Sequence, residues 1–161
     1  CSPDGKWVLY TLLGSGKPTL WRVSMNGGAP QQLTDRFTSS PVISPDGKLI
    51  ACFYREDQPN SAGKIALLPF EGGEPIKLFD VSTSIGRLLR WTPDGRALTY
   101  IVTASGISDV WSQPIDGGAP RQLTNFKTDQ IFWFDWSRDG KQLAVARGSV
   151  ASDVVLISSF R

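Results

Sequence analysis

A five-residue motif recurs four times along the chain at nearly even spacing. It reads SPDGK at 2–6 and again at 44–48, TPDGR at 92–96 and SRDGK at 137–141. The interval between copies is about 45 residues, which lies in the range of repeat proteins such as solenoids and propellers. A chain with this pattern is expected to fold as a series of similar units.

A second motif, which contains a glycine pair, has the same period. It reads NGGAP at 26–30, EGGEP at 71–75 and DGGAP at 116–120. Each copy lies between two copies of the first motif. Because two different motifs alternate with one period, accidental similarity is excluded and the whole chain is interpreted as repeats.

The segments between the motifs have the pattern of short β-strands. Runs such as WVLYTLL at 7–13 and ALTYIV at 97–102 follow the first motif and show the alternation typical of a strand. A second run follows, and the glycine pair then turns the chain into a third, shorter strand. A further strand precedes the motif in the last three copies. Four short strands in each repeat and no helical stretch predict an all-β fold, a β-propeller of four-stranded antiparallel blades.

The strand count predicts an incomplete ring. We expect a single β-propeller segment of about four blades, with repeats at approximately 1–37, 38–80, 85–125 and 129–161. The first repeat lacks its inner strand and the last lacks its outer strand. Propellers of this repeat type usually close with six to eight blades, so two interpretations stay open: a partial propeller from a longer chain, or half of an eight-bladed homodimer.

The aspartates of the repeated motif are interpreted as turn residues and not as catalytic or calcium-binding groups. Proline presets φ early in a turn, aspartate accepts hydrogen bonds from the backbone that follows it, and glycine adopts positive φ. A turn is needed in every blade, whereas a catalytic site is needed once. The motif therefore indicates the places where the chain reverses direction.

The inventory of reactive side chains predicts no catalytic set within the chain. There is no histidine, so the usual Ser-His-Asp triad and the commonest zinc ligand are excluded. The two cysteines, Cys1 and Cys52, occupy positions that are apolar in other copies and are expected to pack as apolar residues. We predict no metal and no cofactor.

Charge and hydropathy exclude two classes of partner. The net charge of +2 comes from 17 basic and 15 acidic side chains that are scattered along the chain. The chain has no cluster of basic residues, so nucleic-acid binding is not expected. No apolar run approaches the roughly 20 residues that cross a bilayer, so direct membrane insertion is not expected.

With these motifs the chain resembles the TolB-type, WD-like propeller repeat, whose hallmark is the SPDGK turn. The glycine-pair motif is similar to blade endings in the propeller regions of bacterial serine/threonine kinases. The resemblance implies a non-catalytic interaction or sensor module, located in the periplasm or otherwise outside the cytoplasm, which binds a protein partner or small ligand. An alternative is the accessory, gating propeller of a prolyl-oligopeptidase-like hydrolase whose catalytic domain lies elsewhere.

Specificity is expected where the repeats differ. On the predicted inner strands, Arg87 stands where other copies have Ser39 and Phe132. Arg90 and Asp135 share one repeat position, which is Val42 in the second repeat. Buried charges need partners, so these side chains should face the channel or its mouth. They are interpreted either as ion pairs between neighbouring blades or, with Trp133, as contacts for a ligand.

One hairpin differs in length from its counterparts. Measured from the motif aspartate to the glycine pair, the loop at 55–64 makes the hairpin of the second repeat three residues longer than those of the first and third. Arg55, Glu56 and Asp57 at its start are either a solvated loop tip or contacts for a partner.

Overall fold

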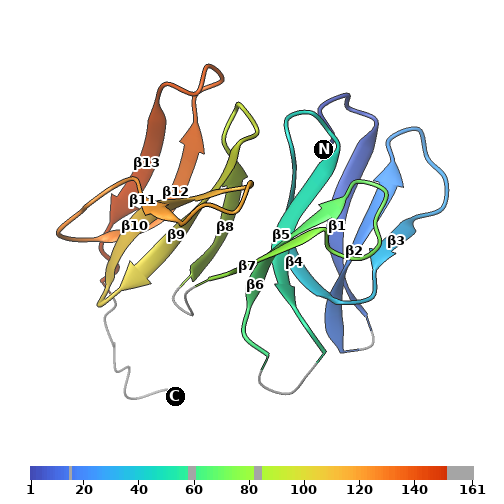
Figure 1. The fold of residues 1–161 in the computed structure, drawn as a ribbon, viewed down its shortest axis with the longest axis horizontal. Helices are drawn as coiled ribbons and strands as arrows, with labels where there is room; N and C mark the ends of the chain where they lie inside the picture. The colour runs from blue at the N-terminus through green and yellow to red at the C-terminus, as the bar shows by residue number, and fades with distance from the viewer. Residues whose placement is uncertain (15, 58–60, 82–84, 152–161) are drawn as a thin grey trace, which may run out of the picture.

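The computed structural model describes residues 1–14, 16–57, 61–81 and 85–151, without the side chains of Ile85 and Arg87. These residues form thirteen β-strands and no helix. The strands make four antiparallel sheets, which stand side by side in chain order from blue to red (Figure 1). The prediction of an all-β fold built from antiparallel blades is confirmed.

The first two sheets contain seven strands. The first has the order β1 (Trp7–Gly14), β2 (Lys17–Ser24), β3 (Gln31–Thr34). The second has the order β4 (Phe37–Ile43), β5 (Leu49–Arg55), β6 (Lys64–Pro69), β7 (Lys77–Asp80). The first sheet therefore lacks a counterpart of β4, as the motif positions predicted.

The third and fourth sheets contain the remaining described strands. The third has the order β8 (Ile85–Trp91), β9 (Ala97–Ala104), β10 (Ile107–Pro114), β11 (Arg121–Gln122). The fourth pairs β12 (Gln130–Trp136) with β13 (Leu143–Gly148). The strand predicted near the end of the chain lies outside the described residues. In sheets two and three the strand order follows the chain order, as in a propeller blade.

Both faces of the second sheet are buried by its neighbours. Ile50 on β5 packs against Leu20 and Leu33 of the first sheet. The next residue, Ala51, faces the other way and packs with Leu89 of the third sheet. Because alternate residues point to opposite faces, β5 is apolar along most of its length. The core is thus a series of layers between successive blades.

The two cysteines differ in environment. Cys52 is fully buried in the second sheet, and burial raises the pKa of its thiol to about 12. The packing prediction is confirmed for this residue. Cys1 is exposed, so the same prediction is wrong for it: no apolar surface covers the side chain at this position before the first strand.

Each SPDG-type motif forms the same hydrogen-bonded turn. At Asp46, Oδ1 accepts a hydrogen bond from the Ser44 hydroxyl at 2.6 Å and from the Lys48 backbone N–H at 3.1 Å. The Ser44 hydroxyl oxygen in turn accepts a bond from the Leu49 N–H at 2.9 Å. Equivalent bonds form around Asp4, Asp94 and Asp139. These bonds within the turns support the interpretation of the repeated aspartates as turn residues.

The motif turns also contact one another from blade to blade. A methyl group at Gly47 would lie 3.7 Å from the Pro3 ring, and one at Gly95 would lie 3.6 Å from the Pro45 ring. Gly140 and Pro93 repeat the contact between the third and fourth sheets. Proline and glycine of the motif therefore have two roles. They shape the turn, and they let neighbouring turns pack closely.

Candidate functional site

The inner strands of the second, third and fourth sheets line a shallow hollow together with β1 of the first sheet. It has a volume of about 440 Å³ and is hereafter called the inner-strand hollow. Residues of β1, β4, β8 and β12 contribute to its wall together with the chain start: Cys1, Leu9, Pro41, Val42, Ile43, Arg90, Trp91 and Asp135. The strands that approach the propeller axis thus present both apolar and charged groups to one open space.

Arg90 lies between two of the residues predicted with it. Its Nε is 3.7 Å from Oδ1 of Asp135, and its guanidinium carbon is 4.6 Å from the centre of the Trp133 ring. Arg90 comes from β8, while Trp133 and Asp135 come from β12 of the next blade. The ion pair between neighbouring blades is therefore present. The side chain of Arg87 lies outside the described residues.

The constellation of Arg90, Trp133 and Asp135 is accessible to a ligand. Trp133 is 53% exposed although it is a large aromatic residue in a strand. The carboxylate of Asp135 accepts a hydrogen bond from the Trp136 N–H at 2.9 Å and stays largely exposed. A cation, a carboxylate and a flat apolar ring thus occupy one surface, and they can contact polar and apolar parts of the same ligand.

The long loop begins with a charge cluster that ties two sheets together. Asp57 accepts hydrogen bonds from Lys17 Nζ at 2.8 and 2.9 Å and from Arg36 Nη1 at 3.1 Å. The Lys17 ammonium, more than any other group, holds the pKa of the Asp57 carboxyl below its ordinary value. Arg55 instead stacks its guanidinium 4.5 Å from the Phe37 ring centre. Asp57 is therefore fixed at the boundary of the first and second sheets.

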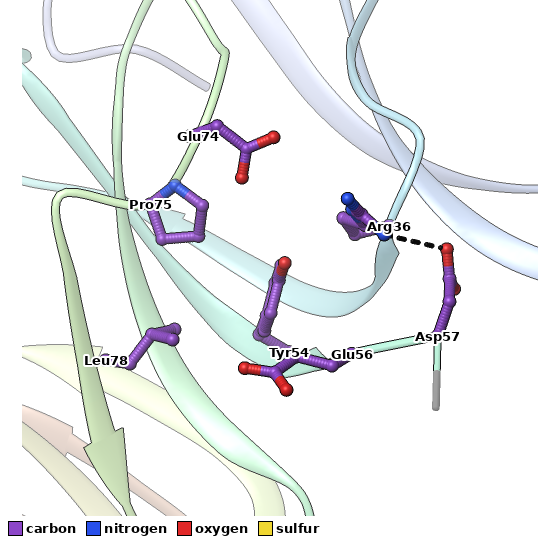
Figure 2. A pocket seen from close by; sticks show the side chains of 7 residues that line it. All are labelled: Arg36, Tyr54, Glu56, Asp57, Glu74, Pro75 and Leu78. Carbon is purple, nitrogen blue, oxygen red and sulfur yellow. Dashed lines mark hydrogen bonds and ion pairs between the residues drawn. The ribbon is translucent and has the colours of Figure 1, made fainter. Parts of the chain in front are cut away.

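A second recess lies beside this cluster. It has a volume of about 400 Å³ and is hereafter called the loop pocket. Its lining comes from the β3–β4 connection, β5, the start of the long loop and the segment around β7: Arg36, Tyr54, Glu56, Asp57, Glu74, Pro75 and Leu78 (Figure 2). Glu56 and Asp57, predicted from the loop length, meet here, whereas Arg55 is not part of the lining.

Sequence reasoning missed two charged residues of this pocket. Arg36 belongs to the connection between blades, and Glu74 belongs to the glycine-pair motif. A signal was available for Glu74. Aligned by the glycine pairs, Glu74 stands where the other copies have Ala29 and Ala119. Such a departure from the repeat marks a residue that the blade itself does not require.

Metal binding finds no support in the arrangement of side chains. Among the described residues, no group of three or more His, Cys, Asp or Glu side chains is placed to hold a metal ion. The same part of the chain contains no helix of the length and apolar character that a membrane span needs.

Comparison with known proteins shows which fold the chain has. No protein-family model matches the chain. A TolB-type protein from Agrobacterium tumefaciens superposes with a TM-score of 0.64 and 29% identity, over 91% of this chain and 55% of that one. The β-propeller domain of the trilobed protease from Pyrococcus furiosus gives a TM-score of 0.55 at 22% identity, over 80% and 42% of the two chains. The fold is that of a TolB-like β-propeller.

Two curated relatives are similar to this chain in sequence. An uncharacterized protein of Agrobacterium fabrum is 33% identical over 129 residues, which are 77% of this chain and 41% of the relative. YuxL, an uncharacterized peptidase of Bacillus subtilis, is 26% identical over 139 residues, which are 86% of this chain and 20% of the peptidase.

Proposed function

We propose that this chain is a non-catalytic interaction module, which binds a protein partner or small ligand through the inner-strand hollow and the adjoining blade loops. The observation that carries the proposal is the position of Arg90 between the Trp133 ring and the Asp135 carboxylate. These groups lie on an accessible surface and come from two blades.

The blade repeat supports a recognition role for these residues. Aligned by the motif aspartates, Arg90 corresponds to Val42 in the second repeat, and Trp133 corresponds to Ser40 and Leu88. A blade can therefore form without a charge or a tryptophan at these positions. A rigid scaffold that holds variable side chains in fixed places is the usual basis of binding by repeat proteins.

The class and location of the partner are also part of the proposal. The scattered charge disfavours nucleic acid, so a protein or a small ligand is the preferred partner. The TolB-like fold supports a place outside the cytoplasm. The mechanism is presentation of side chains on a stiff ring, without a bond being made or broken.

Peptide selection tests the proposal. A phage library of random peptides is selected against the immobilised chain, and the affinity of each enriched peptide is measured for the variants Trp133→Ala and Asp135→Asn. We expect at least about tenfold weaker binding, because a buried aromatic or a charged contact contributes roughly 1–2 kcal/mol. The matched controls are Leu13→Ala and Asp80→Asn, both exposed and away from the hollow.

Two results would contradict the interaction role. One is that no peptide is enriched. The other is that enriched peptides bind the Trp133→Ala and Asp135→Asn variants as tightly as they bind the control variants. In either case the constellation around Arg90 is an ion pair that only links two blades.

The second candidate is an accessory propeller of a hydrolase. It is favoured by the likeness to YuxL and to dipeptidyl-peptidase 5 of Aspergillus fumigatus, which is 25% identical over 83% of this chain. The natural full-length protein would then react with a fluorophosphonate probe at an active-site serine outside these 161 residues. Absence of labelling in the folded full-length protein would remove this candidate.

A further inference from the structure

The loop pocket contains polar groups that the propeller repeat does not need. Its apolar wall is common to the blades, since Pro75 and Leu78 match Pro30 and Leu33. Its polar groups are not common. The position of Arg36 is Val81 in the second repeat and Phe126 in the third. The position of Tyr54 is Leu12 in the first repeat and Val102 in the third, and that of Glu74 is Ala29 and Ala119.

Tyr54 directs its hydroxyl into the pocket, where it makes no hydrogen bond with the residues that the structure describes. The residue is only 4% exposed. Figure 2 shows its hydroxyl directed toward the space between Glu74 and Arg36, with no hydrogen bond to any of the other lining residues. A hydroxyl in this position can form a hydrogen bond with a ligand that enters the pocket.

The charge of the pocket is negative and incompletely neutralised. Asp57 is paired with Lys17 and Arg36. Among the described residues, the cation paired with Glu56 is Lys64, whose Nζ lies 3.9 Å from the carboxylate. Within the described residues, no lysine or arginine nitrogen forms an ion pair with Glu74, which lies across the pocket from Arg36 (Figure 2). The arrangement therefore favours a cation over an anion or a neutral group.

The shape of the lining selects the kind of cation. Pro75 and Leu78 form an apolar wall on one side of the Tyr54 ring (Figure 2). Lysine and arginine carry a long apolar stem that ends in a charged group, and they bury the stem while the head contacts acidic or polar atoms. The described part of the chain offers no three-carboxylate cluster suited to a metal ion here.

We propose that the loop pocket binds a basic side chain, lysine or arginine, from an extended segment of a partner protein. The stem lies along Pro75 and Leu78, the cation approaches Glu74 and Glu56, and the Tyr54 hydroxyl accepts a hydrogen bond from it. This inference rests on the proposed interaction role, but it uses residues separate from the inner-strand hollow.

The direct test uses two peptides that differ only in charge. The complete chain, labelled at its three tyrosines, is titrated with Ac-Gly-Arg-Gly-NH₂ and with Ac-Gly-citrulline-Gly-NH₂, and the ring signals are followed by NMR. The arginine peptide should shift the Tyr54 signal in a saturable manner with little effect on Tyr10 and Tyr100. The citrulline peptide, similar in shape but neutral, should bind about tenfold more weakly or not at all.

A charge-swapped variant supplies the matched control. Glu74→Ala combined with Ala119→Glu gives the second blade the residue of the third and leaves the net charge unchanged. We expect the arginine peptide to bind this variant about fivefold more weakly. Should the double variant fail to fold, Glu74→Gln tests the same carboxylate without a change in shape.

Three outcomes would overturn the inference: no saturable shift at Tyr54, equal binding of the two peptides, or unchanged affinity in the Glu74 variants. A fourth separates it from the proposed function. If Asp135→Asn abolishes binding of the arginine peptide while the charge-swapped variant retains it, the basic group binds in the inner-strand hollow. The loop pocket proposal then fails and the interaction role stands.

Discussion

The indole N–H of Trp91 donates a hydrogen bond to the backbone carbonyl of Val42 over 3.2 Å, and so joins β8 to β4 of the preceding blade. Trp136, at the equivalent position of the next repeat, donates to the Thr99 hydroxyl over 3.1 Å. In both cases a tryptophan at the end of an inner strand spans the boundary between two sheets. Successive blades are therefore linked by directional bonds as well as by apolar packing.

The substitution Trp91→Phe should lower the free energy of unfolding by about 1–3 kcal/mol, because it removes the bond to Val42 and leaves a void between the sheets. Urea unfolding measures the change. Trp21→Phe is the control, since the Trp21 indole donates to Thr19 on its own strand and no bond between blades is lost. Equal destabilisation by the two variants would contradict a specific role for Trp91.

The substitution Asp46→Ala should lower the free energy of unfolding by about 1–2 kcal/mol, because two hydrogen bonds of the motif turn are lost. Asp46→Asn keeps an acceptor oxygen at the same position and should cost less than half as much. Thermal unfolding of the two variants is compared. If both are equally destabilised, the charge of the aspartate matters more than the turn geometry.

Acid should weaken the fold through the same turns. Hydrogen bonds from Ser44 and from the Lys48 N–H hold the pKa of Asp46 below its ordinary value of 3.8, and the other motif aspartates are lowered in the same way. A carboxyl with a lowered pKa in the folded state stabilises the protein above the unfolded pKa, and this stabilisation is lost as the pH falls through the folded pKa. The urea midpoint should therefore change little from pH 7 to 5 and decrease below about pH 4.

The four motif aspartates act together in this dependence, so one substitution should reduce it only in part. Asp46→Asn, which does not titrate, should show a smaller decrease of the urea midpoint between pH 5 and 3 than the unmodified chain. A midpoint that rises on acidification would contradict the account.

Alanine substitution should destabilise the protein by different amounts at the two glycines of the pair. Both glycines have positive φ, 90° at Gly72 and 100° at Gly73, so alanine is strained at either position. A methyl group at Gly72 would also lie 2.6 Å from the Leu33 carbonyl oxygen, whereas at Gly73 it meets nothing within 4 Å. Gly72→Ala should therefore be more destabilising than Gly73→Ala by at least about 1 kcal/mol. Equal unfolding midpoints of the two variants would contradict this prediction, and would show that the first sheet shifts to accommodate the added methyl group.

Much of the fold could be predicted because each blade repeats the same local rules. The motif turn uses only residues within a few positions of Asp46, and the strand faces follow from alternation, as at Ile50 and Ala51. Contacts between blades were harder to predict. The approach of Gly47 to Pro3 joins residues of different repeats, and no local pattern encodes that distance.

The candidate site could be predicted in part for the same reason. Arg90 and Asp135 were identifiable because charges on an inner strand need partners, and they do meet. The loop pocket was not identifiable from the loop alone. Arg36 and Glu74 come from separate connections, and only the fold brings them to the same recess as Tyr54. Their departure from the repeat was visible in the sequence, but their proximity was not.

We infer that residues shared by the blades hold the fold, and we propose that residues that differ between blades bind the partner. The most direct test measures peptide affinity and thermal stability for two variants, Trp133→Ala with Asp135→Asn, and Asp46→Ala. We predict that the first variant loses at least about tenfold in affinity with Tm lowered by less than about 4 °C, since an exposed ion pair contributes little to stability. The second should lower Tm and keep its affinity within about twofold while folded. The opposite result, with affinity lost at Asp46 and retained without Trp133 and Asp135, would contradict the account.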